Sequence, residues 1–224
     1  METLENIVWR AFTGSHAHLS IGTDRIRRYA PGYSPLIGFA DAREADFAAL
    51  APHCGKAERF YTAEWRGPEP EGWSIEVETT MRSMMWEGGA PAPDDALGAR
   101  LLGHEHVAQM QALSDITRPG PFGPRTIELG EWFGVFDGER LVAMAGERLK
   151  AGALHEISGV CTLPECQGRG LARRLTLHIL RRQLARGEQP FLHVASSNQR
   201  ARELYRRIGF VERREVPMRI VVLR

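Results

Sequence analysis

The stretch Cys166-Gln167-Gly168-Arg169-Gly170-Leu171-Ala172 lies between an apolar run, residues 157–163, and a helix-like stretch, residues 171–186. Its two glycines lack a Cβ, so the backbone can adopt left-handed dihedral angles and approach a ligand closely. The first turn of the helix that follows presents N–H groups that have no acceptor within the helix. The sequence therefore predicts an anion site at this turn, best suited to phosphate.

Two common phosphate-binding motifs do not fit the stretch. A loop that binds no ligand and needs two glycines only for its backbone geometry would also fit it. A nucleoside-triphosphate P-loop requires Gly-Lys-Ser or Gly-Lys-Thr, and neither occurs in the sequence. A dinucleotide-binding turn requires a third small residue at the position of Arg173. The pattern that does fit is Gln-x-x-Gly-x-Ala, from Gln167 to Ala172.

A second pattern, Asn-x-x-Ala-x-x-Leu-Tyr-x-x-x-Gly-Phe, runs from Asn198 to Phe210 after an intervening helix and strand. Together the two patterns resemble the signature motifs of the GCN5-related N-acetyltransferases (GNAT). Residues 143–148 (AMAGER) and 156–162 (EISGVCT) also resemble the FR47-like subgroup of predicted acetyltransferases. This resemblance covers residues 98–224.

Composition and charge are consistent with a globular protein that has room for one large domain or two small ones. The chain has 224 residues, of which 43% are hydrophobic and 25% charged. The N-terminus, Met1-Glu2-Thr3-Leu4-Glu5, is acidic, and no apolar run reaches the roughly 18 residues that span a bilayer. Three cysteines in unrelated spacings argue against a disulfide framework. We expect a cytoplasmic protein without a membrane partner.

The C-terminal part of the chain is basic. From Glu165 onward there are 14 arginines and no lysines against five glutamates, which favours an anionic ligand. Nucleic acid is not expected, because these arginines are not interleaved with aromatic residues. No metal site is expected either, since His16 and His18 have no nearby carboxylate or cysteine partner.

The order of elements in the C-terminal part predicts a strand meander followed by a crossover. The expected strands and helices are strand 132–136, strand 140–149, strand 154–163, helix 171–186, strand 191–195, helix 198–207 and strand 218–223, with hairpin turns at Asp137-Gly138 and Ala151-Gly152. Because a strand–helix–strand crossover returns in the same direction, strands 154–163 and 191–195 should be parallel.

The Gly- and Pro-rich residues 87–95 predict a linker between an N-terminal domain, residues 1–90, and a GNAT domain, residues 98–224. In the N-terminal part we expect a helix at 41–50 and strands at 60–65 and 73–79, and after the linker a helix at 104–113. The fold class is α/β (α+β). The resemblance implies a mixed, mostly antiparallel sheet with a splayed parallel strand pair, and by analogy alone it suggests that residues 1–90 are a degenerate GNAT-like half.

The resemblance also implies a cosubstrate, acetyl-CoA, lying where the two parallel strands splay, with its pyrophosphate on the glycine turn. The residues that it assigns to cofactor binding are Val160, Cys161, Thr162, Gln167, Gly168, Arg169, Gly170, Leu171, Ala172, Asn198 and Arg202, with Arg200 as an alternative to Arg202. Asn198 also suits a plain helix cap.

For catalysis the resemblance assigns Tyr205 as the acid that protonates the departing thiolate, although a tyrosine packed beside Phe210 would fit the same pattern. Glu156 is the candidate base, acting through a water, and Glu147 on the neighbouring strand is its rival. Cys161 has no neighbouring histidine in the sequence, so direct attack is simpler than a covalent thioester route.

We therefore expect an acyl-CoA-dependent N-acyltransferase that transfers acetyl to a primary amine of a small molecule, an amino acid or a peptide. The alternative is a non-catalytic module that binds acyl-CoA or a protein and retains the fold. The sequence leaves open the amine acceptor and whether the protein is a homodimer.

Overall fold

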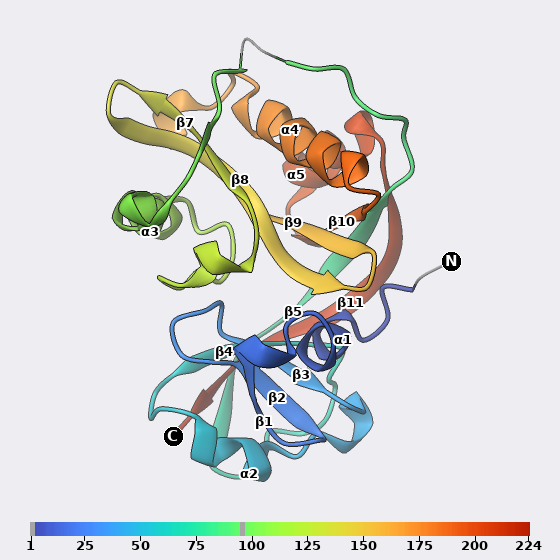
Figure 1. Cartoon of the computed structure of the whole chain (residues 1–224). Helices are drawn as coiled ribbons and strands as arrows, with labels where there is room; N and C mark the ends of the chain where they lie inside the picture. The colour runs from blue at the N-terminus through green and yellow to red at the C-terminus, as the bar shows by residue number, and fades with distance from the viewer. Residues whose placement is uncertain (1–2, 95–96) are drawn as a thin grey trace.

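The computed structural model describes residues 3–94 and 97–224. Met1 and Glu2 of the acidic N-terminus and Asp95 of the predicted linker lie outside the described residues. The strands form a mixed sheet in the order β1-β2-β3-β4-β11-β5-β10-β9-β8-β7-β6, which curls through the whole molecule (Figure 1). The expected α/β class with a mostly antiparallel sheet is confirmed.

The predicted meander is present in the C-terminal part. β7 (Trp132–Asp137), β8 (Arg140–Ala151) and β9 (Leu154–Thr162) pair antiparallel, and the short β6 (Arg100–Leu101) extends the sheet beyond β7. The hairpin turns contain Gly138 and Gly152 in the left-handed region, at φ 59° and 61°. The two predicted hairpins are therefore present, although β8 extends to Ala151, two residues beyond the predicted end.

The crossover after β9 also follows the prediction. A short 3-10 turn (Pro164–Cys166) leads into α4 (Leu171–Ala185), β10 (Gln189–Ala195) and α5 (Gln199–Ile208). β9 and β10 are parallel, as expected. α4 turns its apolar side toward the sheet and buries Leu171, Leu175, Ile179 and Leu180 in the core of this part of the molecule.

Two long strands connect the N-terminal and C-terminal parts of the chain. β5 (Trp73–Trp86) pairs with both β10 and β11 (Phe210–Leu223), while β11 also pairs with β4 (Arg59–Ala63). The strand predicted at 218–223 is thus the end of a strand of 14 residues. β5 precedes residues 87–94 and pairs with β10 and β11, which follow them, so one sheet contains strands from both sides of the predicted linker. The division into two domains stays a prediction.

The N-terminal part is an α/β unit built on short elements. It contains α1 (Ile7–Thr13), β1 (Ser20–Gly22), β2 (Ile26–Tyr29), β3 (Leu36–Phe39), β4 and α2 (Phe47–Leu50), with 3-10 turns at Ala17–Leu19, Ala42–Glu44 and Ala51–His53. The helix predicted at 41–50 is therefore two separate short turns, each begun by an aspartate whose side chain accepts a backbone N–H. α1 and the strands β1 to β3 were not predicted.

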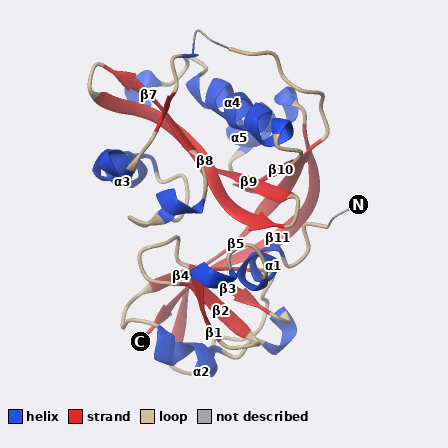
Figure 2. Ribbon diagram, viewed as in Figure 1, coloured by secondary structure: helices blue, strands red, loops and turns tan. Residues whose placement is uncertain are grey.

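Helices cover both faces of the central strands. α3 (Val107–Thr117), preceded by a 3-10 turn (His104–His106), packs on β8 and β9, and α4 packs on the opposite face of the same strands (Figure 2). A further 3-10 turn, Thr126–Leu129, follows α3. None of the described helices is long and apolar enough to cross a membrane.

Candidate active site

The parallel strands β9 and β10 separate after a short stretch of pairing. Their register runs from Leu154 opposite Gln189 to Glu156 opposite Phe191 and ends there. Beyond that point β9 still pairs with β8 as far as Thr162, and β10 still pairs with β5 as far as Ala195. In the described register, the β10-facing edge of Val160, Cys161 and Thr162 is therefore unpaired, so its backbone groups are available to a ligand.

The glycine turn lies just beyond β9, at the start of α4. Gly168 and Gly170 are exposed and have left-handed φ values of 80° and 75°. A Cβ added at either position would meet no heavy atom within 4 Å, so the space beside the turn is open. In this segment Cys166, Gln167 and Arg174 donate their backbone N–H to carbonyls, whereas the first turn of α4, from Leu171 to Arg173, has no such intrahelical acceptors. The turn thus fits a pyrophosphate group.

The beginning of α5 lies next to this turn. Arg200 donates from Nη1 to Oε1 of Gln167 at 3.0 Å, which links the starts of the two helices. Asn198 caps α5, because its side chain accepts the N–H of Ala201 at 3.1 Å. Arg202 is buried and donates to Glu212 and to the carbonyl of Ser196. Arg202 therefore has partners within the protein, and Arg200 is the one of these two arginines that contacts the glycine turn.

A β-bulge shapes the strand edge that faces the gap between β9 and β10. Gly159 and Val160 together oppose the single residue Ala145 of β8, between the pairs Ser158 with Gly146 and Cys161 with Met144. Gly159 adopts φ 63°, and a Cβ there would come within 2.4 Å of the ring of Trp132. Only glycine suits this position, since the backbone is left-handed and the indole fills the adjacent space.

Tyr205 of α5 is buried beside the unpaired part of β9. Its ring packs edge-on against Phe210 with the centroids 6.0 Å apart, so the packing alternative is present as well. Burial, with a smaller contribution from Cys161, raises the pKa of Tyr205 well above its usual value. Burial also raises the pKa of Cys161 to about 11. Both groups are therefore protonated at neutral pH, which suits a tyrosine acid and makes Cys161 a weak nucleophile.

Glu156 is fully buried and is the last residue of β9 that pairs with β10. Arg148 donates to both of its oxygens, from Nε at 2.9 Å and from Nη2 at 2.8 Å. Nδ1 of His193, on β10, lies 2.8 Å from Oε1 of Glu156. Burial opposes ionisation, but the charge of Arg148 and the hydrogen bonds from His193 and Arg148 outweigh it and lower the pKa of Glu156 to about 2.

His193 and Arg148 were missed by the sequence reasoning. His193 is 37 residues from Glu156 in the sequence and reaches it only because β9 and β10 are parallel neighbours. The available signal was a polar side chain within the apolar strand Phe191-Leu192-His193-Val194. Arg148 precedes β9 by one hairpin, at an irregularity in the β8–β9 register.

Glu147, the rival base, lies in a different environment. It accepts hydrogen bonds from Gln183 at 3.0 Å, from the N–H of Glu131 at 3.1 Å and from Arg186. These donors give Glu147 a structural role, in which it ties β8 to the end of α4. Of the two carboxylates, Glu156 is the one at the end of β9–β10 pairing, and its role as the base stays a prediction.

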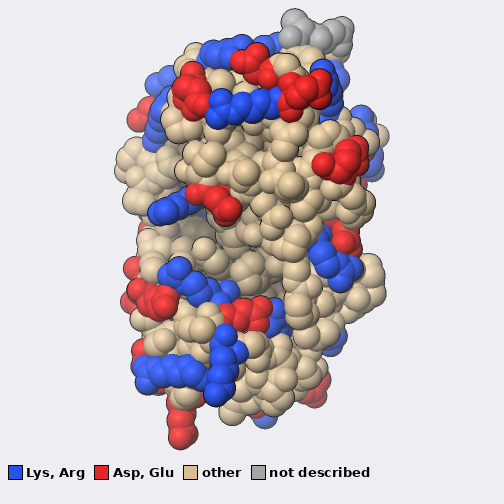
Figure 3. Space-filling view, turned by 90° about the vertical axis from the view of Figure 1, so that its left-hand side faces the viewer, with Lys and Arg blue, Asp and Glu red and all other residues tan. Residues whose placement is uncertain are grey.

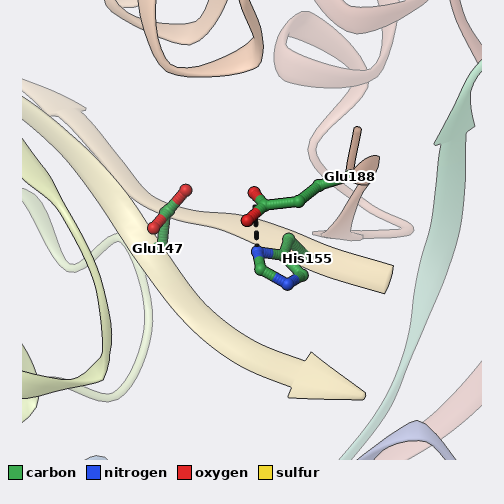
Figure 4. Close-up of side chains that lie close together, drawn as sticks. All are labelled: Glu147, His155 and Glu188. Carbon is green, nitrogen blue, oxygen red and sulfur yellow. Dashed lines mark ion pairs between the residues drawn. The ribbon is translucent and has the colours of Figure 1, made fainter. Parts of the chain in front are cut away.

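Glu147, His155 and Glu188 form a cluster whose possible ligand atoms lie within 4.8 Å of one another (Figure 4). Nδ1 of His155 is 2.7 Å from Glu188. The Arg186 guanidinium forms ion pairs with Glu147 and with Glu188, the latter at 2.7 Å. Because this cation already lies between the carboxylates, the cluster is better described as a structural ion-pair network than as a metal site.

The N-terminal and C-terminal parts of the chain meet near Arg148. Nη1 of Arg148 is 4.0 Å from the Cβ position of Gly120, in the loop after α3. From the N-terminal part, Tyr29 donates its hydroxyl to the carbonyl of Arg148 at 3.5 Å. Figure 3, which views the α3 side of the molecule, shows that this surface is hollowed between the two parts.

A separate hollow of about 560 Å³ lies on the outer side of α4, beneath the loop at residues 88–94. Arg173, Arg181, Leu177 and Trp86 are among its lining residues. Arg173, Leu177 and Arg181 lie on a different side of α4 from the leucines and isoleucine that it buries against the sheet, so the hollow is distinct from the gap between β9 and β10.

Comparisons with known proteins agree with this fold. Residues 132–219 match the family model described as FR47-like protein. A crystal structure from Novosphingobium aromaticivorans, assigned to the GNAT family of acetyltransferases, is 35% identical, with a TM-score of 0.92 and coverage of 100% of each chain.

More distant structures support the fold alone. A GCN5-related N-acetyltransferase from Kribbella flavida is 14% identical, with a TM-score of 0.60 over 97% of this chain and 95% of that one. A GCN5-related N-acetyltransferase-like protein from Streptococcus suis is also 14% identical, with a TM-score of 0.59 over 100% of this chain and 94% of that one. The comparison with curated proteins returns no match.

Proposed function

The chain belongs to the GCN5-related N-acetyltransferase family, and on that basis we propose that it transfers acetyl from acetyl-CoA to a primary amine of a small molecule, an amino acid or a peptide. The observation that carries the proposal is the end of β9–β10 pairing at Glu156 and Phe191, directly beside an open glycine turn.

Each end of the cosubstrate has a matching part of the chain. The N–H groups from Gly168 to Ala172 bind the pyrophosphate, and Arg200 at the neighbouring helix start adds positive charge. The unpaired edge from Val160 to Thr162 hydrogen-bonds the amides of the pantetheine arm. The bulge at Gly159 directs a backbone N–H toward the thioester carbonyl and stabilises the oxyanion.

The chemical step needs a group that removes a proton from the amine and one that protonates the leaving sulfur. The ion-paired cluster around Glu156 provides the first, next to the gap between the strands. Tyr205, held protonated by its burial, provides the second. Transfer is direct, because the Cys161 thiol is protonated at neutral pH.

The test is release of free thiol from acetyl-CoA in the presence of a panel of primary amines, with Tyr205→Phe as the comparison. We expect turnover of at least one amine by the wild type and a loss of about 100-fold in kcat for Tyr205→Phe, the usual contribution of one acid or base. Acetyl-CoA affinity, measured by calorimetry, should stay the same in the variant. Binding of acetyl-CoA without turnover of any amine would instead favour the non-catalytic module.

A further inference from the structure

His193 is placed to exchange a proton in the gap between the strands. It lies on β10 two residues beyond Phe191, where pairing with β9 ends. Its side chain shares the face of the sheet that carries Glu156, and Nδ1 is 2.8 Å from Oε1 of that carboxylate. The imidazole therefore lies beside Glu156, just beyond the point at which β9 and β10 stop pairing.

Glu156 itself is poorly suited to accept the proton. It is 0% exposed, and its two oxygens receive N–H groups of Arg148 and the imidazole. A carboxylate with a pKa of about 2 takes a proton from an ammonium group only at a large cost in free energy. An imidazole is the side chain that ordinarily exchanges protons near neutral pH.

The hydrogen bond to Glu156 also selects the tautomer of His193. An ionised carboxylate can only accept, so Nδ1 must carry the hydrogen and donate it to Oε1. Nε2 is then left with a free lone pair. The bidentate contact with Arg148 fixes the carboxylate, and the carboxylate in turn fixes the imidazole ring.

We propose that Nε2 of His193 is the general base of this enzyme and that Glu156 is a positioning residue that orients the imidazole and stabilises its protonated form. The assignment rests on the proposed function and replaces Glu156 as the proton acceptor. The acceptor ammonium gives one proton to Nε2, and the free amine then attacks the thioester carbon. As the C–N bond forms and the C–S bond breaks, Tyr205 gives its proton to the sulfur. The nitrogen loses a second proton, which restores Tyr205 through solvent, and His193 releases its proton to solvent.

The charged groups that face His193 come from several elements. Glu156 and Arg148 approach it from β9 and β8. Next to β4, Glu64 and Asn6 line a small hollow of about 10 Å³ that His193 also lines. Glu64 is itself engaged, because it accepts the N–H of Asn6 at 3.1 Å and an N–H of Arg214 at 2.8 Å. Glu156 is therefore the carboxylate whose removal should change the proton affinity of His193 most.

The test compares His193→Asn with the wild type, using acetyl-CoA and the best amine of the panel. Asparagine retains a donor at the Nδ1 position for Glu156 but has no Nε2. We expect unchanged acetyl-CoA affinity, a fall in kcat/KM of at least 100-fold at pH 7, and loss of the acidic limb of the pH profile. In Glu156→Gln that limb should move to lower pH, because the imidazolium loses its carboxylate. Added imidazole should partly restore turnover in His193→Gly.

A second measurement uses the wild-type protein alone, so its result does not depend on whether a variant folds. In wild-type protein labelled with [15N]histidine, NMR should show His193 as the Nδ1–H tautomer, with an apparent pKa that matches the acidic limb of the rate profile. A mismatch, or turnover by His193→Asn with the wild-type rate and pH profile, would overturn the assignment alone. A wild type that binds acetyl-CoA but acetylates no amine would overturn the proposed function and this assignment with it.

Discussion

Replacing Gly170 by asparagine and, separately, by aspartate tests the anion site with two side chains of nearly the same shape. Both residues tolerate the left-handed backbone that Gly170 adopts at φ 75°, and both favour the start of a helix. A Cβ at this position meets nothing within 4 Å, so neither side chain is excluded by contact. The two variants should therefore differ in charge and in little else.

The expected difference follows from Coulomb's law. A carboxylate about 6 Å from a pyrophosphate with two negative charges is repelled by about 2 kcal/mol at an effective dielectric of about 50, between the values for a pair near a protein surface and for bulk water. That energy corresponds to a roughly 30-fold weaker Kd. Because the turn is exposed, the difference should shrink as the salt concentration rises.

The assay is calorimetric titration of both variants with acetyl-CoA and with CoA at low and high salt, with thermal unfolding to show equal stability. We expect Gly170→Asn to bind close to the wild-type affinity and Gly170→Asp to bind about 30-fold more weakly at low salt. Equal affinities for the two variants, with both folded, would refute the placement of the pyrophosphate on this turn.

Three further predictions concern stability. In urea unfolding, Gly159→Ala should lower the free energy of unfolding by about 3 kcal/mol, because the left-handed backbone is strained for alanine and the added Cβ meets the ring of Trp132. The control Gly138→Ala, which has a similar φ of 59° but open space beside it, should lower it by only about 1 kcal/mol. Burial lowers the pKa of His16 to about 4, so the unfolded state binds a proton at this histidine before the folded state does as the pH falls below about 6.5. Between pH 7 and pH 5 the wild type should therefore lose about 2 kcal/mol more unfolding free energy than His16→Gln. Equal losses in the two proteins would contradict this prediction. Arg186→Met should cost about 3 kcal/mol, because it leaves the buried carboxylate of Glu147 without its cationic partner, against under about 0.5 kcal/mol for Arg207→Met on the exposed surface.

The parts of the fold that could be predicted are those marked by local signals. Gly138 and Gly152 identify the hairpins, and the glycines of the 166–172 stretch identify the start of α4, because each needs a left-handed backbone. The parallel direction of β9 and β10 follows from the chirality of the crossover. These features depend on neighbours in the sequence and on general rules of chain connection.

The parts that could not be predicted depend on distant contacts. α1 begins at Ile7 after Asn6, whose φ is 47° and whose side chain makes no capping hydrogen bond, so the start of the helix lacks the usual capping geometry. β5 pairs with two strands of the C-terminal half, β10 and β11, and β11 pairs with two strands of the N-terminal half, β4 and β5. No local pattern in the sequence reveals this exchange of partners. The N-terminal strands β1 to β3 are at most four residues long, and the segment between β2 and β3 contains Pro31, Gly32 and Pro35.

The candidate site shows the same division. The turn at Gly168 and Gly170 and the position of Tyr205 could be recognised because they are contiguous motifs. The bonds of Glu156 to Arg148 and His193 could not, because they join three strands and depend on an irregular register. A sequence pattern identified the carboxylate, and only the fold shows that it is ion-paired and strongly acidic.

The most direct test of the central claim is a crystal structure of the protein with acetyl-CoA. We predict the pyrophosphate within hydrogen-bonding distance of the N–H groups from Gly168 to Ala172, and the thioester between β9 and β10 just beyond Glu156 and Phe191. A nucleotide bound elsewhere, for example in the hollow lined by Arg173 and Arg181 over α4, with the gap between the strands empty, would contradict the account.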